Sequence, residues 1–181
     1  AHHANTTVLG VEGIGQAGMQ ASIAAGAPVT LTEVDGFCDG TAVKRVGDLT
    51  FDICRKSLND ILTVSNEEVC AAMQLLWETS RTIPEPSGAM GLAGLIQFAH
   101  MHPEKIRGKR LLSIICGANM DFSKLGLIAS QSAVGAHRRR YLRLHLSESR
   151  GGLLAMLEKH FADVNVSEFQ YGKTHTTEAY P

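Results

Sequence analysis

This sequence of 181 residues has no excess of charge of either sign, because 17 lysines and arginines are balanced by 18 aspartates and glutamates. The formal charge of −1 argues against nucleic acid and membrane surfaces as partners, since both attract proteins with a basic excess. No window approaches the roughly 18 consecutive apolar residues of a membrane-spanning helix. Residues 1–5 lack the basic segment and apolar stretch of a secretion signal, so we expect a protein of the cytoplasm or of an organelle matrix.

Cysteine is scarce, and its spacing excludes two familiar roles. The four cysteines stand far apart, without a Cys-x-x-Cys pair, at Cys38, Cys54, Cys70 and Cys116. This spacing favours free thiols in a reducing compartment over a disulfide framework or a zinc cluster. Apolar residues make up 44% and charged residues 19%, which is far from the composition of disordered chains. We therefore expect one globular domain or slightly more.

The order of apolar runs and helical patterns predicts an α/β fold with a buried parallel sheet. Residues 8–11 are a short β-branched strand, and residues 61–64 are a second strand of buried type. Helices are expected over 16–25 and 50–58 between them. Residues 111–115 are the strongest strand candidate, an uninterrupted apolar run of the kind found in parallel sheets. The carboxyl ends of such strands are where α/β sheets bind ligands.

Two further helices follow the second strand. Ser65 and Glu68 have the spacing of a capping box, which predicts a helix that begins there and runs to about Arg81. The two prolines of residues 84–88 must break it, and residues 89–99 start another helix that is small and apolar on nearly every side. A helix with that composition is expected inside the protein.

Residues 13–18 spell Gly-x-Gly-x-x-Gly between the first strand and its helix, with Glu33 about twenty residues further on. On pattern alone this is a dinucleotide-binding fingerprint. Glu12, however, places a carboxylate where the pyrophosphate would have to lie, and like charges would meet there. A glycine-eased turn from strand to helix is the favoured interpretation, and a dinucleotide-binding module remains an alternative.

The pattern of apolar residues in the sequence changes after about residue 130. Leucines alternate over residues 142–146, a helix is expected over 152–161, and a second strand over 164–171. The pattern is that of a β-α-β unit, with a boundary that we place between residues 136 and 137. The sequence stops at Pro181 before the unit could cover its own sheet, so we expect truncation at the C-terminus as well as at the N-terminus.

Four segments in one order and spacing resemble a known family. They are Val-Leu-Gly-Val-Glu at 8–12, Asp-Gly-Thr-Ala-Val-Lys-Arg-Val-Gly-Asp-Leu-Thr-Phe at 39–51, Glu-Pro-Ser-Gly-Ala-Met-Gly-Leu-Ala-Gly-Leu at 85–95, and Cys-Gly-Ala-Asn-Met-Asp-Phe at 116–122. Together they resemble the second half of the catalytic domain of biosynthetic threonine dehydratases. Residues 141–171 resemble the first β-α-β unit of that family's ACT-like regulatory domain. The resemblance implies that residues 1–136 belong to a three-layer, fold-type-II catalytic domain and 137–181 to a truncated regulatory domain.

The resemblance implies a pyridoxal-phosphate dependent lyase of isoleucine biosynthesis, which converts L-threonine to 2-oxobutanoate and ammonia. This chemistry needs a Schiff-base lysine and a cradle of backbone N–H groups for the phosphate. The family takes both from earlier in the chain, in a Ser-x-Lys-x-Arg-Gly-Ala motif and a run of glycines. The seven lysines here lie outside any such motif, and no glycine run exceeds Gly151-Gly152. The chain alone is therefore expected to contain no catalytic residue and to be inactive.

The resemblance also implies cofactor contacts. Cys116 stands where the family places a Ser or Cys beside the pyridine nitrogen, and Glu85 would lie near the same ring edge. Asp39 and Gly40 are loop candidates for the same site. The ordinary alternatives are a buried structural cysteine, a helix-entry carboxylate favoured by the helix dipole, and a tight turn.

A regulatory role and other partners follow only from the resemblance. Phe169 and Tyr171 are candidate contacts for an isoleucine or valine effector, with ordinary sheet packing as the alternative. L-serine is an alternative substrate, and relatives form dimers or tetramers, so a homo-oligomer is expected. The competing function is a non-catalytic homologue that binds an amino acid or a regulatory partner.

No metal site is expected from the sequence. Glu12 matches a cation-binding position of related racemases, but Gly18 stands where those relatives place the partner carboxylate. His100 and His102 are two residues apart, so their side chains diverge on a helix and are better explained as solvated residues at its end.

Overall fold

The computed structural model describes residues 6–146 and 149–172. Residues 1–5, which were expected to carry no secretion signal, lie outside the described residues. Lys173, one of the seven lysines outside the Schiff-base motif, also lies outside them. The chain divides into two compact units, one ending at Arg140 and one beginning at Tyr141. In the part of the chain that the structure describes, no helix is both long and apolar enough to cross a bilayer.

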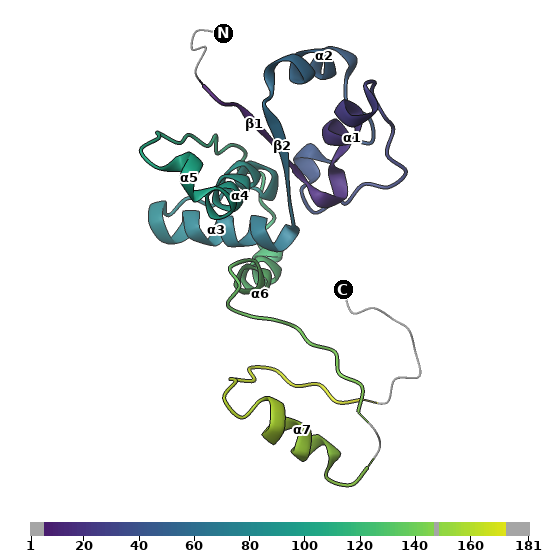
Figure 1. Cartoon of the computed structure of the whole chain (residues 1–181), viewed down its shortest axis with the longest axis vertical. Coiled ribbons are helices and arrows are strands. Elements are labelled where there is room, and N and C mark those ends of the chain that lie inside the picture. Colours follow the sequence, from purple (N-terminus) through teal and green to yellow (C-terminus); the bar gives the residue numbers. More distant parts are fainter. Residues whose placement is uncertain (1–5, 147–148, 173–181) are drawn as a thin grey trace. The chain divides into compact units, whose positions relative to one another are not determined.

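A parallel pair of strands lies at the centre of the first unit (Figure 1). Strand β1 (Leu9–Gly13) pairs with β2 (Asp60–Val64) in a register that runs from Leu9 opposite Asp60 to Gly13 opposite Val64. Parallel strands need a crossover connection. This one contains the short turn η1 (Ile14–Gln16), helix α1 (Gly18–Ala25), the turn η2 (Asp39–Thr41) and helix α2 (Asp48–Ser57). The predicted α/β class with a parallel sheet is confirmed.

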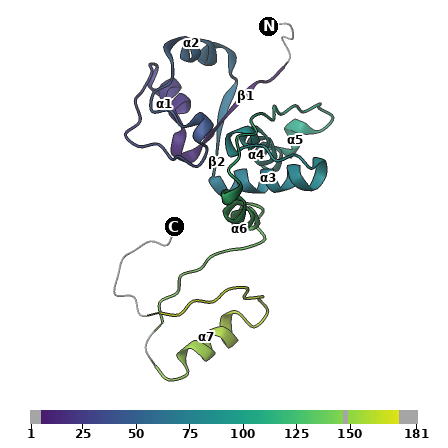
Figure 2. The ribbon, with the colours of Figure 1, turned by 180° about the vertical axis from the view of Figure 1, so that it is seen from behind.

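Figures 1 and 2 show the two strands between two groups of helices. Helices α1 and α2 lie on one side, and α3 (Asn66–Ser80) and α4 (Pro86–Met101) lie on the other. Helix α6 (Leu125–Gly135) packs against α3. The short helix α5 (Pro103–Ile106) and turn η3 (Phe122–Lys124) belong to the connection between α4 and α6.

The helix boundaries follow local signals in the sequence. Helix α1 ends at Gly26, which adopts a left-handed backbone with φ of 74°. The predicted capping box at the start of α3 is present, because the Ser65 hydroxyl accepts from the Glu68 N–H and the Glu68 carboxylate accepts from the Ser65 N–H. Helix α4 begins earlier than the predicted 89–99, because Pro86 suits the first turn of a helix.

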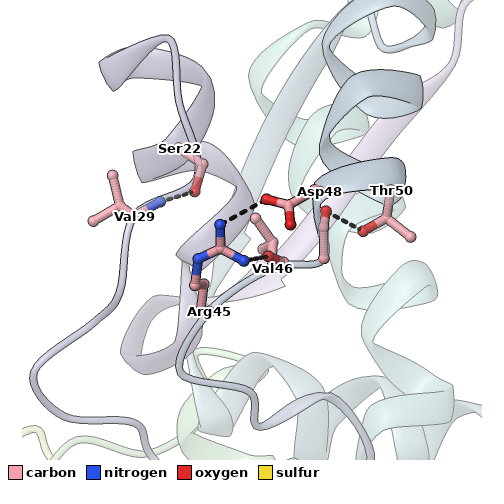
Figure 3. A network of polar contacts seen from close by, with 7 residues as sticks. Ser22, Val29, Arg45, Val46, Asp48 and Thr50 are labelled. Carbon is pink, nitrogen blue, oxygen red and sulfur yellow. Dashed lines mark hydrogen bonds and ion pairs between the residues drawn. The ribbon is translucent and has the colours of Figure 1, made fainter.

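Two local sets of polar contacts lie at the end of α1 and at the start of α2 (Figure 3). The buried Ser22 hydroxyl donates to the Gly18 carbonyl over 2.6 Å and accepts from the Val29 N–H over 2.9 Å. Arg45 pairs with Asp48 over 2.6 Å at the first position of α2. The ion pair is exposed and contributes little free energy, so the buried Ser22 does more to fix the loop that follows α1.

The core of the first unit lies between β2, α3 and α4. Its buried members are Cys38, Val64, Val69, Cys70, Ala72, Met73, Ala89, Met90, Ala93 and Ile128. The last turn of α6 approaches the backbone of α3 so closely that a Cβ at Gly135 would collide with the Glu67 carbonyl. Glycine at this position therefore sets how near the two helices can pack.

The strand predicted over residues 111–115 is wrong. The segment forms no strand, and Leu112 and Ile114 expose 88% and 75% of their surface. Its other face rests on α4, where the buried Ser113 hydroxyl has no hydrogen-bond partner in the described part of the chain and faces Gly91. A strand requires a hydrogen-bonded neighbour, and the described residues contain no strand beside this segment.

The second unit contains helix α7 (Gly152–His160), close to the predicted helix over 152–161. The two strands predicted around it, over 142–146 and 164–171, are wrong for the residues that the structure describes. Most of their alternating apolar side chains are about half exposed or more, for example Leu142 and Val164. Alternation selects a strand face only when a partner strand completes the ladder, and the described part of this unit offers none.

Two buried thiols have raised pKa values. Burial, followed by the charges of Asp35 and Asp39, raises the pKa of Cys38 from 9.0 to about 12. Burial also raises the pKa of Cys70 to about 12, with smaller contributions from Glu67 and Cys38. Both groups stay protonated when folded while the unfolded chain loses these protons near pH 9. Their contribution to stability is therefore intact below about pH 9 and falls as the pH rises toward 12.

The thiols are expected to react in an order set by burial. At pH 8 a maleimide should label the exposed Cys116 first and the half-buried Cys54 more slowly. Cys38 and Cys70 should react only after unfolding in urea. Peptide mapping by mass spectrometry over time measures this order, and labelling of Cys38 or Cys70 as fast as Cys116 in the native protein would contradict the described core.

Replacement of Gly135 by alanine is expected to lower the free energy of unfolding by about 1–3 kcal/mol, because the new Cβ pushes α6 away from α3. Gly126→Ala in the same helix is the matched control. Nothing lies within 4 Å of a Cβ there, so it should leave stability unchanged or raise it by up to about 1 kcal/mol. Urea unfolding measures both, and equal effects would disprove the close contact.

Candidate functional site

Three segments that are distant in the sequence meet at the start of α4. Gly40 from turn η2 lies so close that a Cβ on it would be 3.0 Å from both the Glu85 Oε1 and the Ser87 Oγ. Gly117, about thirty residues after Glu85 in the sequence, approaches the same carboxylate, and a Cβ there would collide with it. The structure thus brings together the predicted residues Gly40, Glu85 and Cys116 with its neighbour Gly117.

Glu85 is held by its backbone, which leaves its carboxylate available. Its N–H donates to the Gly117 carbonyl over 3.1 Å, and the residue caps α4 through its backbone without a side-chain cap bond. Among the described residues, no hydrogen bond or ion pair involves the carboxylate of this half-buried side chain. A half-buried carboxylate without a protein partner at a helix N-terminus is placed to interact with a ligand.

Cys116 immediately precedes Gly117, the glycine that lies against this carboxylate. The left-handed backbone of Gly117, with φ of 75°, turns the chain toward Glu85 immediately after the thiol. Gly88 of α4 admits the Cys116 backbone, since a Cβ there would collide with the Cys116 carbonyl. The alternative of a buried structural cysteine is wrong, because Cys116 is exposed.

Asp39 contributes to the turn η2 through its backbone. It begins turn η2, where its carbonyl accepts from the Ala42 N–H over 3.2 Å, and its side chain is exposed. The structure therefore agrees with the alternative interpretation, in which Asp39 forms a tight turn. Its predicted cofactor contact stays a prediction.

Sequence reasoning missed three polar residues that surround the cluster. The hydroxyl of Thr41 lies 3.4 Å from that of Ser87 and donates to the Gln16 Oε1 over 2.9 Å. Gln16 is only 6% exposed and donates to two carbonyls of the loop before η2. A glutamine beside a glycine pattern carries no recognisable motif, so only the folded contacts identify it.

The Gly-x-Gly-x-x-Gly pattern serves as a turn. The Glu12 carboxylate accepts from the Met19 and Gln20 N–H groups over 2.8 Å each, at the start of α1. These are the donors that a pyrophosphate would need. Gly15 is required because a Cβ there would come 2.6 Å from the Cβ of Asp35. The favoured interpretation of a glycine-eased turn fits this geometry, and the dinucleotide alternative does not.

The remaining candidates lie apart from this cluster. Within residues 6–146 and 149–172, no group of three His, Cys, Asp or Glu side chains could hold a metal ion. His102 stacks at a tilt on Phe98 near the end of α4. In the second unit, Phe169 and Tyr171 stack with ring centroids 6.5 Å apart and expose 51% and 67% of their surface. Their effector role stays a prediction.

Solved structures share this architecture. The processed form of threonine deaminase isoform 2 from Solanum lycopersicum superposes with a TM-score of 0.68 at 38% identity, covering 71% of this chain and 37% of that one. Serine racemase from Dictyostelium discoideum superposes with a TM-score of 0.58 at 29% identity, covering 67% of this chain and 38% of that one.

Sequence comparison gives the same grouping. The biosynthetic L-threonine dehydratase of Escherichia coli K12 is 39% identical over 164 residues, which is 91% of this chain and 31% of the relative. The threonine dehydratase of Nicotiana attenuata is 35% identical over 167 residues, 92% of this chain and 27% of the relative. The chain thus spans about a third of the length of the curated relatives it matches. Residues 1–117 match the model of the pyridoxal-phosphate dependent enzymes, and the chain belongs to that family.

Proposed function

We propose that the protein acts as a threonine dehydratase, which eliminates water and then ammonia from L-threonine to give 2-oxobutanoate. The observation that carries this proposal is the meeting of Gly40, Glu85 and Cys116 at the start of α4. Each of these residues lies in a segment that resembles the dehydratases, and relatives named threonine dehydratase match 91% of the chain. L-serine, with the same β-hydroxyl, is the alternative substrate.

The residues of the cluster fit the ring edge of pyridoxal phosphate. A planar ring packs best against a surface from which no side chains project. The glycines at positions 40 and 117 keep the space beside Glu85 free of further side chains. An exposed thiol at Cys116 and the unpartnered carboxylate of Glu85 supply the polar atoms. Bound pyridoxal phosphate supplies an electron sink for the negative charge that develops at the α-carbon of the substrate.

The Cys116 thiol would set the charge of the ring. A thiol is only a weak donor and a weak acceptor, so it does not hold a proton on the pyridine nitrogen as a carboxylate would. The unprotonated ring is a weaker electron sink, which suits an elimination that needs only modest stabilisation of the α-carbon. Glu85 would lie at the same edge, since its N–H donates to the carbonyl of Gly117, the residue that follows Cys116.

The cluster has no lysine and no run of consecutive glycines among the residues that the structure describes. We propose that the Schiff-base lysine and the phosphate cradle come from sequence outside these 181 residues. The relatives support this, since the matched region is 31% of the Escherichia coli enzyme.

For the second unit we propose a regulatory role, with an ACT-like domain from about residue 137 to 181. A match over 91% of the chain must extend past Arg140, where the first unit ends. Phe169 and Tyr171 are the proposed contacts for isoleucine or valine, and their exposed, stacked rings support an apolar ligand. The apolar face of this unit supports assembly as a homo-oligomer.

The activity is tested on the native protein isolated from its source. We expect an absorption band of bound pyridoxal phosphate and release of 2-oxobutanoate from L-threonine; release of pyruvate from L-serine tests the alternative substrate. Isoleucine binding without turnover of either substrate would instead support the non-catalytic homologue. Native mass and N-terminal sequence, determined on the same preparation, show whether a Ser-x-Lys-x-Arg-Gly-Ala segment precedes residue 1.

Substitution of Cys116 tests its role at the ring. Cys116→Ser should keep the turnover of L-threonine within about threefold, because a hydroxyl also leaves the ring nitrogen unprotonated. Cys116→Asp should lower it by about tenfold or more, a barrier increase of about 1.4 kcal/mol, and should shift the cofactor absorption band. Equal turnover of the two variants would exclude contact between this side chain and the ring.

A further inference from the structure

We propose that Gln16 is a positioning residue that holds the loop of residues 35–41 against the start of α4, so that Gly40 lies beside Glu85. Only the expected effect on cofactor binding rests on the proposed function. The holding of the loop itself follows from contacts within the first unit.

The Gln16 side chain is buried, and every hydrogen-bonding group of its amide is used. Its Nε2 donates to the Asp35 carbonyl over 2.7 Å and to the Cys38 carbonyl over 2.9 Å. Its Oε1 accepts from the Thr41 hydroxyl over 2.9 Å. The bonds reach the beginning, the middle and the end of the loop. A buried polar group that loses its partners carries a desolvation penalty, so this amide favours one position of the loop.

Thr41 extends the contact from Gln16 to α4. Its hydroxyl oxygen lies 2.9 Å from the Gln16 Oε1 and 3.4 Å from the hydroxyl oxygen of Ser87. Ser87 stands two residues after Glu85, in the first turn of α4. The path of polar contacts therefore connects the buried amide to the helix turn that carries the candidate ring-edge carboxylate.

The loop packs closely against the start of α4 at Gly40. A Cβ at this position would already be 3.0 Å from atoms of Glu85 and Ser87, so the loop backbone lies against both side chains. The first residue of the loop is held separately, since the Asp35 N–H donates to the Gly15 carbonyl over 3.0 Å and its Oδ2 accepts from the Asn66 side chain over 2.7 Å. Cys38 is also held by its burial in the core, so loss of Gln16 should release chiefly residues 39–41.

A matched pair of variants separates positioning from general stability. Gln16→Met keeps the size of the side chain and removes all three bonds. Gln97→Met is the control, because the Nε2 of Gln97 donates to the Thr63 carbonyl over 3.0 Å in the α4–β2 contact, away from the loop. Both variants should lower the melting temperature of the native protein.

Two measurements should distinguish Gln16→Met from Gln97→Met. Hydrogen exchange at the N–H groups of Thr41 and Ala42, which bond to Cys38 and Asp39, should accelerate by about tenfold or more in Gln16→Met and should not change in Gln97→Met. The dissociation constant of pyridoxal phosphate, measured by fluorescence, should rise by about tenfold only in Gln16→Met. Thr41→Val should show a smaller effect in the same direction, and Thr41→Ser should restore the wild-type values.

The possible results distinguish the two proposals. If Gln16→Met and Gln97→Met behave alike in exchange and in cofactor affinity, Gln16 is not a positioning residue, and the proposed function stands. If the wild-type protein binds no pyridoxal phosphate, the proposed function fails. The exchange measurement then still decides whether Gln16 holds the loop.

Discussion

The close backbone contact between the start of α4 and residues 116–117 is the constraint on which the rest of the site depends. The Cys116 carbonyl lies over Gly88, and the Gly117 carbonyl accepts from the Glu85 N–H. These contacts involve main-chain atoms, so they fix positions more firmly than contacts between flexible side chains. They bring the backbone of Cys116 and Gly117 to Glu85 although about thirty residues separate the two segments in the sequence.

One face of α4 makes this arrangement possible. Glycines recur at every third position along it, at Gly88, Gly91 and Gly94. Residues three apart lie near one another on a helix surface, so the three form a strip without side chains. The first two admit residues 113–116, and Gly94 admits Val11 of β1. A single helix thus positions both the central strand and the segment that ends at Cys116.

Sequence reasoning succeeded where local interactions decide the structure and failed where distant ones do. The capping box at Ser65 and the left-handed Gly26 depend on residues within one turn, and both were predictable. The run at 111–115 has every intrinsic preference of a strand, but pairing depends on a neighbour that the described residues do not contain. Gln16 was missed for the same reason, since its partners come from a loop about twenty residues later and only the fold brings them together.

Two glutamates whose carboxylates lie near helix N-termini show how the fold separates structural from chemical roles. Glu12 uses both carboxylate oxygens to accept from the first N–H groups of α1, so its charge is satisfied within the protein. Glu85 is itself the N-cap residue of α4, whereas Glu12 lies in β1, and Glu85 caps its helix only through its backbone. Its carboxylate, held between two glycines, has no partner in the described part of the chain. A glutamate near a helix N-terminus therefore occupies the N–H donors that a pyrophosphate would need in one case, and in the other it leaves its carboxylate open to a ligand.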